Sequence, residues 1–458
     1  MPLTPEQKIL KKRIYNRLKV DEPIYPGDDR YVLLYNDLNT DPVANLKEHI
    51  DLTDVESMQF FSGFRGSGKS TELLRLKDDL EQDGVFVIYA NALDYINPAE
   101  ELDITDLMIV VAGAFSDALE ADARIGKNIQ KESYWTRIKS YLINTKLDIT
   151  DAAVKTEFTT PAQSVIGGLK SGIDLRLALS TTPTFRQNLQ KLLANRIGEL
   201  KQDIDNFIQD GVKEVKNSLG ADTKVVFILD SLEQIRGSLF NEQTVIQSVE
   251  RTFSQNYKLL ELPSVHTIYT VPPWLKFVMP NGFNKPIIIL HSIRQWENDP
   301  DRSCSEEGNS LFKQIIFKRF GADGMKEFFD NDDKKVNRLI GYCGGSLRDL
   351  LRLLNDTVLP VQDFPVTDDG IERAINNVKS SFLPIAIDDA YWLEKIGKTR
   401  EASLANTQGV NVGKLTRFLD THFVLYFRNG KEWYDIHPLI REEVAFIVKN
   451  NPLPAKNQ

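Results

Sequence analysis

The chain of 458 residues contains little cysteine and no long apolar run, and both absences limit what it can be. Its two cysteines, Cys304 and Cys343, are too few for a disulfide framework, and no Cys-x-x-Cys pair or histidine-rich cluster indicates zinc. No segment approaches the roughly 20 apolar residues that a membrane helix needs. The first residues, MPLTPEQKILKKRIYNRLK, lack the apolar centre of a signal peptide. We therefore expect a cytoplasmic protein without a membrane partner.

Positive charge is also scarce, since the formal net charge of −9 argues against a whole surface built for nucleic acid. A local exception is the segment 8–19, which holds the basic residues Lys8, Lys11, Lys12, Arg13, Arg17 and Lys19. We interpret this segment as the solvated face of an N-terminal helix, with a nucleic-acid contact as the alternative. The hydrophobic content of 41% is ordinary for globular protein, and the length is enough for about two to four domains.

The most informative segment is 63–71, which reads GFRGSGKST and matches the pattern G-x-x-x-x-G-K-[ST]. An apolar run at 58–62 precedes it and a helix-forming run at 72–77 follows it, as a phosphate-binding loop requires. Its glycines let the backbone approach an anion closely, and the N-terminus of the following helix favours phosphate. Lys69 is expected to reach the β- and γ-phosphates, and the Ser70 hydroxyl to hold Mg²⁺. The predicted binding set is Gly63, Arg65, Gly66, Ser67, Gly68, Lys69, Ser70 and Thr71. An ordinary glycine-rich turn is the alternative.

A second motif, KVVFILD at 224–230, has the composition of a buried parallel strand that ends in an acid. Because the C-terminal end of such a strand faces the ligand, Asp230 is the predicted Walker B carboxylate that orients Mg²⁺. Many ATPases place a glutamate directly after this acid to polarise the attacking water, but here the first glutamate is Glu233. Glu233 is therefore the candidate base, and an acid at a helix start is the alternative.

Three further apolar runs, at 85–90, 265–270 and 286–290, complete the pattern of a parallel sheet. With 58–62 and 224–230 they predict an α/β fold, a five-stranded parallel sheet with helices on both faces. Thr270 ends one of these strands, where a hydroxyl can sense a γ-phosphate. A simple strand-end hydroxyl is the alternative.

The run GGSLRDLLRLL at 344–354 indicates a glycine turn, a serine N-cap and a helix with leucines at helical spacing. Arg348 lies in the first turn of that helix, and its planar guanidinium suits contact with a γ-phosphate from a neighbouring domain. A surface ion pair with Asp349 is the alternative.

Residues from about 103 to 222 predict a helical insertion. Helices are expected at 106–120 and 134–143, followed by one amphipathic helix of about 35 residues that begins near Phe185 and has a break at Gly198 or Gly211. Its apolar stripe either packs on the core or binds a partner. The glycine-rich segment 165–183 is hypothesised to bind a partner or to promote oligomerisation.

The last part, 376–450, is typical of a winged helix. Helices at 390–399 and 412–421 precede two strands, 423–428 and 431–436, which the sequence Asn429-Gly430 joins in a predicted two-residue turn. Winged helices often bind DNA, and Lys414 and Arg417 would be the contacts. Because basic and acidic residues nearly balance here, we favour a structural switch element over a DNA reader.

Together these motifs resemble the AAA+/STAND branch of P-loop ATPases, with bacterial STAND-like and origin-recognition-like groups as the nearest pattern. The resemblance implies an N-terminal segment at 1–50, an ATPase core at 51–300, a helical lid at 301–375 and the winged helix at 376–450. It implies ATP and Mg²⁺ as ligands, with Thr270 as sensor 1 and Arg348 as sensor 2. His437, in a run similar to the hydrophobic–His motif of STAND proteins, is implied to contact the β-phosphate of ADP, with buttressing of the hairpin as the alternative.

The chain departs from this pattern in two places. Lys69 and Asp230 stand much farther apart than a minimal core needs, and the stretch 271–288 contains no arginine where ring-forming relatives keep an arginine finger. Lys276 and Lys285 lie there but lack a planar fork. The arginines that remain as substitutes are Arg236, Arg251, Arg294 and Arg319.

We expect a Mg²⁺-dependent ATPase, slow or stimulated by a partner, that acts as a nucleotide-controlled switch. Its predicted catalytic residues are Lys69, Asp230, Glu233 and Arg348. Self-association or a separate effector protein is the expected partner, and the resemblance implies a setting in antiphage defence. A DNA-binding ATPase of the initiator or loader type and a nucleotide-bound scaffold with negligible turnover are the alternatives. No Asn/Thr-Lys-x-Asp motif for guanine is present.

Overall fold

A computed structural model describes residues 2–20, 22–35, 41–125, 134, 136–138, 183–238, 240–279, 285–402 and 409–452. The chain divides into two compact units. The first unit comprises Met1–Asn45, Ser62–Arg75 and Ile289–Gln458, and the second comprises Leu46–Phe61 and Leu76–Ile288. In the part of the chain that the structure describes, no helix is long and apolar enough to cross a membrane.

The central sheet has five strands in the order β2-β3-β4-β1-β5. They are β1 (Met58–Gly63), β2 (Phe86–Asn91), β3 (Val225–Asp230), β4 (His266–Thr270) and β5 (Ile287–Leu290), so all five predicted strands are confirmed. The β2–β3, β3–β4 and β1–β4 pairs are parallel, with Ile228 opposite Ile268 and Phe60 opposite Tyr269. Strands β1, β3 and β4 are buried along their whole length, as expected of a parallel sheet covered on both faces.

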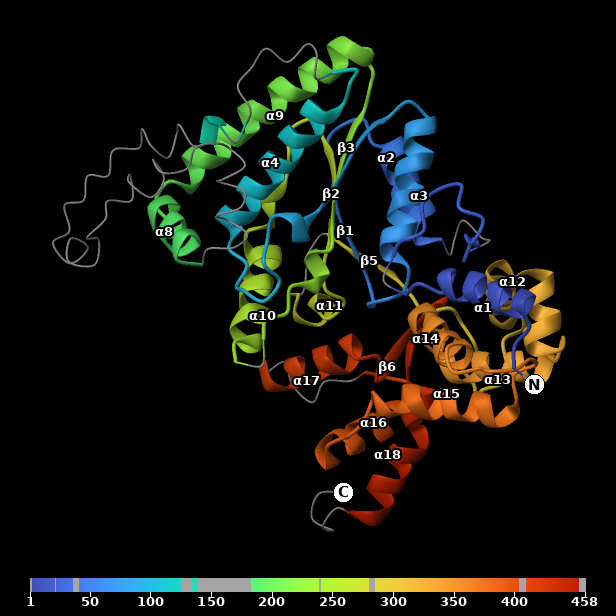
Figure 1. The fold of residues 1–458 in the computed structure, drawn as a ribbon. Helices are drawn as coiled ribbons and strands as arrows, with labels where there is room; N and C mark the ends of the chain where they lie inside the picture. Colours follow the sequence, from blue (N-terminus) through green and yellow to red (C-terminus); the bar gives the residue numbers. More distant parts are fainter. Residues whose placement is uncertain are drawn as a thin grey trace. The chain divides into compact units, whose positions relative to one another are not determined.

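The second unit contains the helices of the predicted insertion. α4 (Ile104–Ala121) confirms the apolar helix expected at 106–120, and Figure 1 shows it beside α9 on one side of the sheet. The single long helix expected from Phe185 onward is wrong, because α8 (Pro183–Leu193) ends before α9 (Ile197–Leu219) begins. The break lies at 194–196, ahead of Gly198, and α9 runs straight through Gly211. Gly211 instead permits close packing, since a Cβ there would lie 2.6 Å from Cε1 of Phe115.

Two sequence predictions for the insertion concern residues that are only partly described. Of the helix expected at 134–143, Tyr134 and residues 136–138 are described and are helical. The glycine-rich segment 165–183 lies outside the described residues, apart from its last residue. The remaining elements of this unit are short. They are η1 (Ala92–Asp94), η2 (Leu232–Gln234), α10 (Glu242–Glu250), the π-helical turn η3 (Arg251–Gln255), η4 (Tyr257–Leu260) and α11 (Leu275–Val278).

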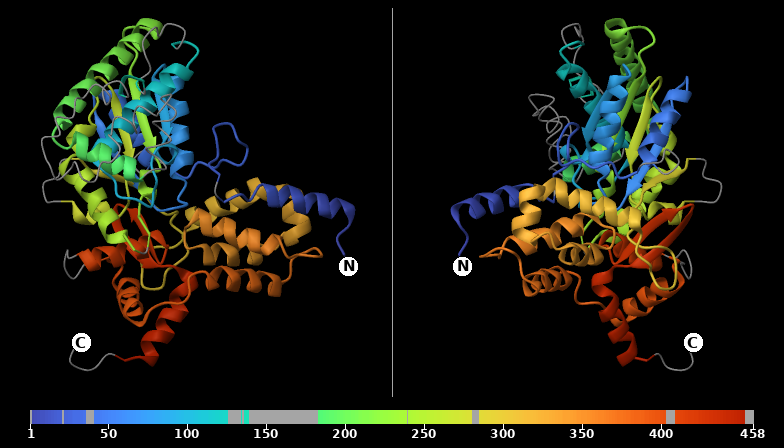
Figure 2. Two further views of the ribbon diagram at one scale, coloured as in Figure 1. Left: turned by 60° about the vertical axis from the view of Figure 1, so that its left-hand side comes forward. Right: turned by 90° about the vertical axis from the view of Figure 1, so that its right-hand side faces the viewer.

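The first unit is mostly helical. α1 (Pro5–Asn16), blue in Figure 2, packs on α12 (Glu306–Phe329) and α14 (Leu347–Val358). α13 (Asp333–Cys343) and α15 (Asp368–Ser380) complete the group, and these four later helices are coloured yellow to orange. The leucines of α14 explain its position, because Leu350, Leu353 and Leu354 are fully buried. α2 (Pro42–Leu52) and α3 (Lys69–Gln82) each continue from the first unit into the second.

The C-terminal part of this unit has the predicted element order. α16 (Ile387–Thr399) and α17 (Gly409–Asp420) precede the antiparallel strands β6 (Val424–Asn429) and β7 (Lys431–Ile436), and α18 (Pro438–Asn450) follows. The predicted two-residue turn is wrong in register, because Asn429 pairs with Lys431 and the turn centres on Gly430 alone. Gly430 has a φ of 80°, which a residue without a Cβ adopts at little cost. That this part forms a winged helix stays an interpretation.

Candidate nucleotide-binding site

The motif at 63–71 forms the strand–loop–helix that the sequence predicts. β1 ends at Gly63, α3 begins at Lys69, and both Gly66 (φ 78°) and Gly68 (φ 94°) adopt the left-handed conformation in the loop between them. The Lys69 side chain is buried, and its Nζ donates to the carbonyl oxygens of Gly63 (2.9 Å) and Phe64 (3.2 Å). A glycine loop with a buried lysine at the start of a helix is suited to hold a phosphate chain.

The N-terminal segment of the first unit fixes the start of α3. The Ile24 N–H donates to Oγ1 of Thr71 (3.0 Å), so this hydroxyl, which the sequence placed in the binding set, has a structural partner. At the next position, the buried Glu72 accepts from the Tyr31 hydroxyl (3.1 Å) and pairs with Arg75 (2.8 Å). Burial raises the pKa of Glu72 although Arg75 opposes it. These contacts hold the helix that carries Lys69 and Ser70.

Arg348 lies against the loop, and its role in sensing bound phosphates stays a prediction. Gly344 and Gly345 both have positive φ, and the Ser346 hydroxyl accepts from the Asp349 N–H (3.2 Å) to cap α14. A Cβ placed on Gly66 would lie only 2.3 Å from Cβ of Arg348. The absence of a side chain at Gly66 is therefore what allows α14 to approach the loop so closely.

Asp349 does not lie on the surface, where the alternative interpretation placed it. It is buried, and its recorded ion pairs are with Arg352 (3.1 Å), His422 (2.8 Å) and His437 (3.5 Å). Burial raises the pKa of Asp349, but the hydrogen bonds and charges of the two histidines outweigh it and hold the pKa well below its ordinary value. Asp349 is therefore a buried carboxylate that remains ionised.

His437 occupies the N-cap of α18 and is fully buried. Its Nδ1 accepts from the Leu439 N–H (3.3 Å), and its ring stacks on Phe382 with centroids 4.8 Å apart. Burial lowers the pKa of His437, and the attraction of Asp349 only partly opposes this. This environment matches the buttressing alternative. The predicted contact with the β-phosphate of ADP stays untested.

His422 is the residue that sequence reasoning missed. It follows α17 and lines a small cavity together with Phe64, Arg65 and Ser67 of the phosphate-binding loop. Nothing in the local sequence marks it, because its importance depends on Asp349, a contact across 73 positions of the chain. The same cavity is lined by His291, Ser292 and Ile293 after β5, by Gly345, Ser346 and Leu347 at the start of α14, and by Leu425.

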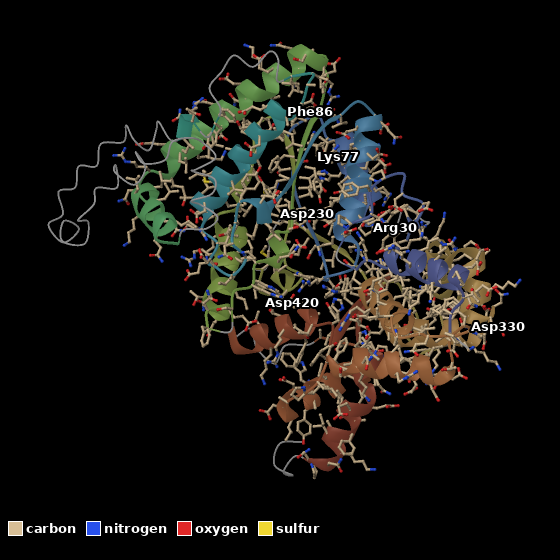
Figure 3. All side chains as sticks on the ribbon, in the orientation of Figure 1. Arg30, Lys77, Phe86, Asp230, Asp330 and Asp420 are labelled. Atoms are coloured by element: carbon tan, nitrogen blue, oxygen red, sulfur yellow. The ribbon has the colours of Figure 1, made fainter. Side chains whose placement is uncertain are left out.

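The predicted Walker B and sensor-1 residues belong to the second unit and are described within it. Asp230, labelled in Figure 3, ends β3 and accepts from the Tyr89 hydroxyl (2.5 Å) and the Ser231 N–H (2.7 Å). Thr270 is fully buried; its Oγ1 accepts from the Leu232 N–H (2.9 Å) and lies 3.4 Å from the Leu229 carbonyl oxygen. The Thr270 hydroxyl thus ties β4 to the turn after β3, as a strand-end hydroxyl does.

Glu233 lies in the short helix η2, directly after the Asp230 turn. Ser231 has a φ of 74° there, a conformation that costs a non-glycine residue about 1 kcal/mol or more and often marks a functional turn. Glu233 is both an acid at a helix start and a residue within one turn of the Walker B acid. Its two interpretations therefore both stay open. No cluster of three or more histidine, cysteine or acidic residues that would hold a metal occurs among the described residues.

The basic residues considered for nucleic acid largely have partners inside the first unit. Lys11 donates to the carbonyl oxygens of Leu359 and Val361, and Arg17 pairs with Asp29 (2.8 Å). Lys414 (3.4 Å) and Arg417 both pair with the buried Asp389 of α16. These pairs compensate the positive charge that a DNA contact would need.

Two of the arginines proposed as a substitute arginine finger have partners within the first unit. Arg319 is buried, donates to the Ile315 carbonyl oxygen (3.1 Å) and has its pKa lowered to about 10 by burial. Arg294 pairs with Glu307 (3.0 Å). Arg236 and Arg251 are exposed in the second unit, so they remain candidates.

No protein-family model and no curated protein matches the chain. Among solved structures it is similar to a Walker-type ATPase of Pyrococcus abyssi, with a TM-score of 0.39 and 10% identity over 94% of this chain and 99% of that one. It is also similar to the ORC2 protein of Aeropyrum pernix in its ADP form (TM-score 0.37, 10% identity, 96% and 98% covered). A third similar structure is Cdc6p from Pyrobaculum aerophilum (TM-score 0.35, 11% identity, 94% and 99% covered). Likenesses this weak do not assign the chain to a family.

Proposed function

We propose that this chain is a P-loop nucleotide-binding protein of AAA+/STAND type that binds ATP with Mg²⁺ and hydrolyses it slowly as part of a regulatory switch. The observation that carries the proposal is the glycine loop 63–68, which leads into buried Lys69 and lies against Arg348 within one compact unit. Lys69 would bind the phosphate chain. Arg348 would contact the γ-phosphate of ATP, which ADP lacks, so that the position of α14 would depend on the nucleotide. Ser70 and Asp230 would hold Mg²⁺, which supplies neutralisation of phosphate charge when bound.

The proposed switch rests on the division of the predicted site residues between the two compact units. The phosphate-binding loop, α14 and the C-terminal helices form one unit, whereas Asp230, Glu233 and Thr270 belong to the other. We therefore propose that ATP and ADP stabilise different states, and that one state exposes a surface for self-association or for a separate effector protein. A role in antiphage defence follows from the sequence resemblance alone and is carried as part of this proposal.

The decisive experiment measures ATP binding and phosphate release by the purified chain, with Lys69→Ala as the test variant. We expect Lys69→Ala to weaken ATP binding about 10- to 100-fold, since a hydrogen bond to a charged group contributes on the order of 1.5–3 kcal/mol. Lys77→Ala is the matched control, because Lys77 lies on the same helix but pairs with Glu81. Equal affinities in all three proteins would overturn the proposal.

Turnover and assembly are separate readouts. Glu233→Gln is expected to retain ATP binding and to lose phosphate release if Glu233 is the base. Mass photometry in ATP and in ADP is expected to show different sizes if the switch controls assembly. Tight ATP binding without turnover or a size change would instead support the scaffold alternative.

A DNA-binding function of the initiator type is the remaining alternative, and two of the similar solved structures carry the names ORC2 and Cdc6p. The contacts that would support it, Lys414 and Arg417, pair with Asp389. DNA affinity that falls steeply with salt, and that weakens in Lys414→Ala, would favour this alternative.

A further inference from the structure

Three side chains from separate elements meet beside the phosphate-binding loop. Asp349 comes from the first turn of α14, His422 from the turn after α17, and His437 from the N-cap of α18. Both histidines address the same carboxylate oxygen, with His422 Nδ1 at 2.8 Å and His437 Nε2 at 3.5 Å from Oδ2 of Asp349. One buried carboxylate therefore serves two rings, and the shorter contact belongs to His422.

His422 has an unpartnered outer nitrogen, a feature that Nε2 of His437 shares. Nε2 of His422 is buried and has no hydrogen-bond partner, and the same is true of Oγ of Ser67 in the loop. Both residues line one cavity, which has room for about one water molecule. His422 is 94% buried and holds a left-handed backbone with a φ of 61°, a strained conformation of the kind that collects at ligand sites. Two orphaned polar groups at a phosphate-binding loop indicate a missing polar ligand atom.

The hydrogen-bond network fixes what His422 can do. Since Asp349 accepts at Nδ1, that nitrogen carries the proton, and Nε2 of the neutral ring presents a lone pair. A phosphate oxygen is also an acceptor, so a direct contact requires a second proton on the ring. The ionised Asp349 stabilises the resulting cation, as carboxylates do for catalytic histidines.

We propose that a phosphate-bearing ligand held at the loop drives proton uptake by His422, and that Asp349 is the positioning residue for this step. The inference rests on the proposed function, because it assumes that the loop holds phosphate. The proton comes from solvent and is released when the ligand leaves. Because the bound form then carries one more proton than the free form, affinity for the ligand falls as the pH rises.

The groups that face His422 include both signs of charge. On α14, Asp349 favours the cation, and Arg352, which pairs with Asp349 (3.1 Å), disfavours it. His437, at the N-cap of α18, contacts the same carboxylate. The cavity lining adds the positive charge of Arg65 and the titratable ring of His291. An anionic ligand shifts the balance toward the cation.

His437 differs from His422 in its surroundings. It addresses the same oxygen of Asp349, yet it does not line the cavity, and its Nδ1 is occupied by the Leu439 N–H. The control for proton uptake is His266, which belongs to the second unit and to none of the predicted binding residues.

The test is calorimetric titration of ADP into the full chain near pH 7, in buffers that differ in ionisation enthalpy, so that the protons taken up on binding are counted. We expect net uptake by the wild type relative to His422→Asn, which tolerates a left-handed backbone. Asp349→Asn is expected to reduce the uptake, and His266→Gln, in the second unit, to leave it unchanged. The wild-type Kd for ADP is expected to rise up to tenfold per pH unit above the transition, relative to His422→Asn.

Two further outcomes keep the test decisive. If His422→Asn does not fold, long-range nitrogen–proton spectra of the wild type report the same event, because only five histidines are present and Nε2 of one must gain a proton on ADP addition. Equal proton uptake in wild type and His422→Asn, or an unchanged Nε2 signal, would overturn the inference. If the wild type binds no ADP, or if Lys69→Ala binds ADP as tightly as the wild type, the proposed function is overturned instead.

Discussion

At the scale of single residues, Gly66 is where the loop and α14 meet. Its φ of 78° strains any residue with a Cβ, and an added methyl group would lie 2.3 Å from Cβ of Arg348. We expect Gly66→Ala to weaken ADP binding at least about tenfold, because backbone strain and the clash together exceed 1.4 kcal/mol. Hydrogen exchange of residues 347–358 is expected to rise in the same variant, since α14 must move or the loop must deform.

Gly68→Ala is the matched comparison for this prediction. Gly68 has an equally unfavourable φ of 94°, but the nearest atom to an added Cβ is Cδ1 of Leu347 at 3.5 Å, an ordinary contact. Exchange in α14 should therefore stay near the wild-type level in Gly68→Ala. If both variants loosen α14 to the same extent, backbone strain alone is responsible and the contact with Arg348 has no separate role.

What the sequence could predict at this scale follows from how local the signal is. Gly66, Lys69 and Arg348 were identified because each lies in a motif whose spacing has a physical reason. His422 was missed because its partner Asp349 lies 73 positions away and neither residue forms a pattern with its neighbours. His437 lies in a recognisable motif, but its burial beside Asp349 depends on the tertiary structure, which the motif does not predict.

At the scale of elements, a buried ion pair joins α8 to α4. Arg186 lies 3.0 Å from Asp106 and also reaches Glu100 (2.6 Å), and both Arg186 and Asp106 are almost fully buried. Burial raises the pKa of Asp106, and the charge of Arg186 opposes that rise. We expect Arg186→Met to destabilise the α4–α8 packing by about 3 kcal/mol, because it leaves a buried carboxylate without its cation.

Native-state hydrogen exchange of residues 104–121 and 183–193 is the measurement for this prediction. The control is Lys201→Met, which removes a pair between Lys201 and Asp205 one turn apart on α9, where a loss below about 0.5 kcal/mol is expected. A small change in Arg186→Met, with Asp106 then protonated near neutral pH, would show that the packing tolerates the neutral acid.

Helices and strands were predictable where the spacing of apolar residues and the amino-acid composition indicated the same element. The five strands are short apolar runs bounded by turn residues, and each appears in the sheet within about two residues of its expected place. The break between α8 and α9 was placed wrongly because the apolar spacing continues from Leu193 to Leu200 without interruption. Residues 194–196 separate the two helices, and the glycines that suggested a break lie inside α9.

At the scale of the whole molecule, the predicted site residues belong to two compact units. The sequence separates Lys69 from Asp230 by a long insertion, and the loop belongs to the first unit whereas Asp230 belongs to the second. Motifs predict the chemistry of each set of residues because each set is local in the sequence, whereas no single motif contains a tertiary arrangement.

The pH dependence of stability tests both units at once. His266 in the second unit, and His291 and His437 in the first, have lowered pKa values, with burial as the largest cause in each. Because the folded pKa lies below the unfolded value of about 6.5, the unfolded chain binds more protons once the pH falls below 6.5. Stability is therefore fully present above about pH 6.5 and is lost on acidification toward the folded pKa values. Each histidine contributes at most about 1.4 kcal/mol per pH unit.

Hydrogen exchange at pH 7.5, 6.5 and 5.5, corrected for the intrinsic rates, separates the contributions of the two units. The His266→Gln variant is expected to flatten the pH dependence for peptides of the second unit only, since Gln keeps a partner for the Ser57 hydroxyl, which lies 2.9 Å from the His266 ring. Asp349 does not contribute to the pH dependence between pH 5.5 and 7.5, because its lowered pKa keeps it ionised throughout this range. If His266→Gln flattens both units equally, they unfold as one cooperative body, and nucleotide binding then cannot act by changing how the units are coupled.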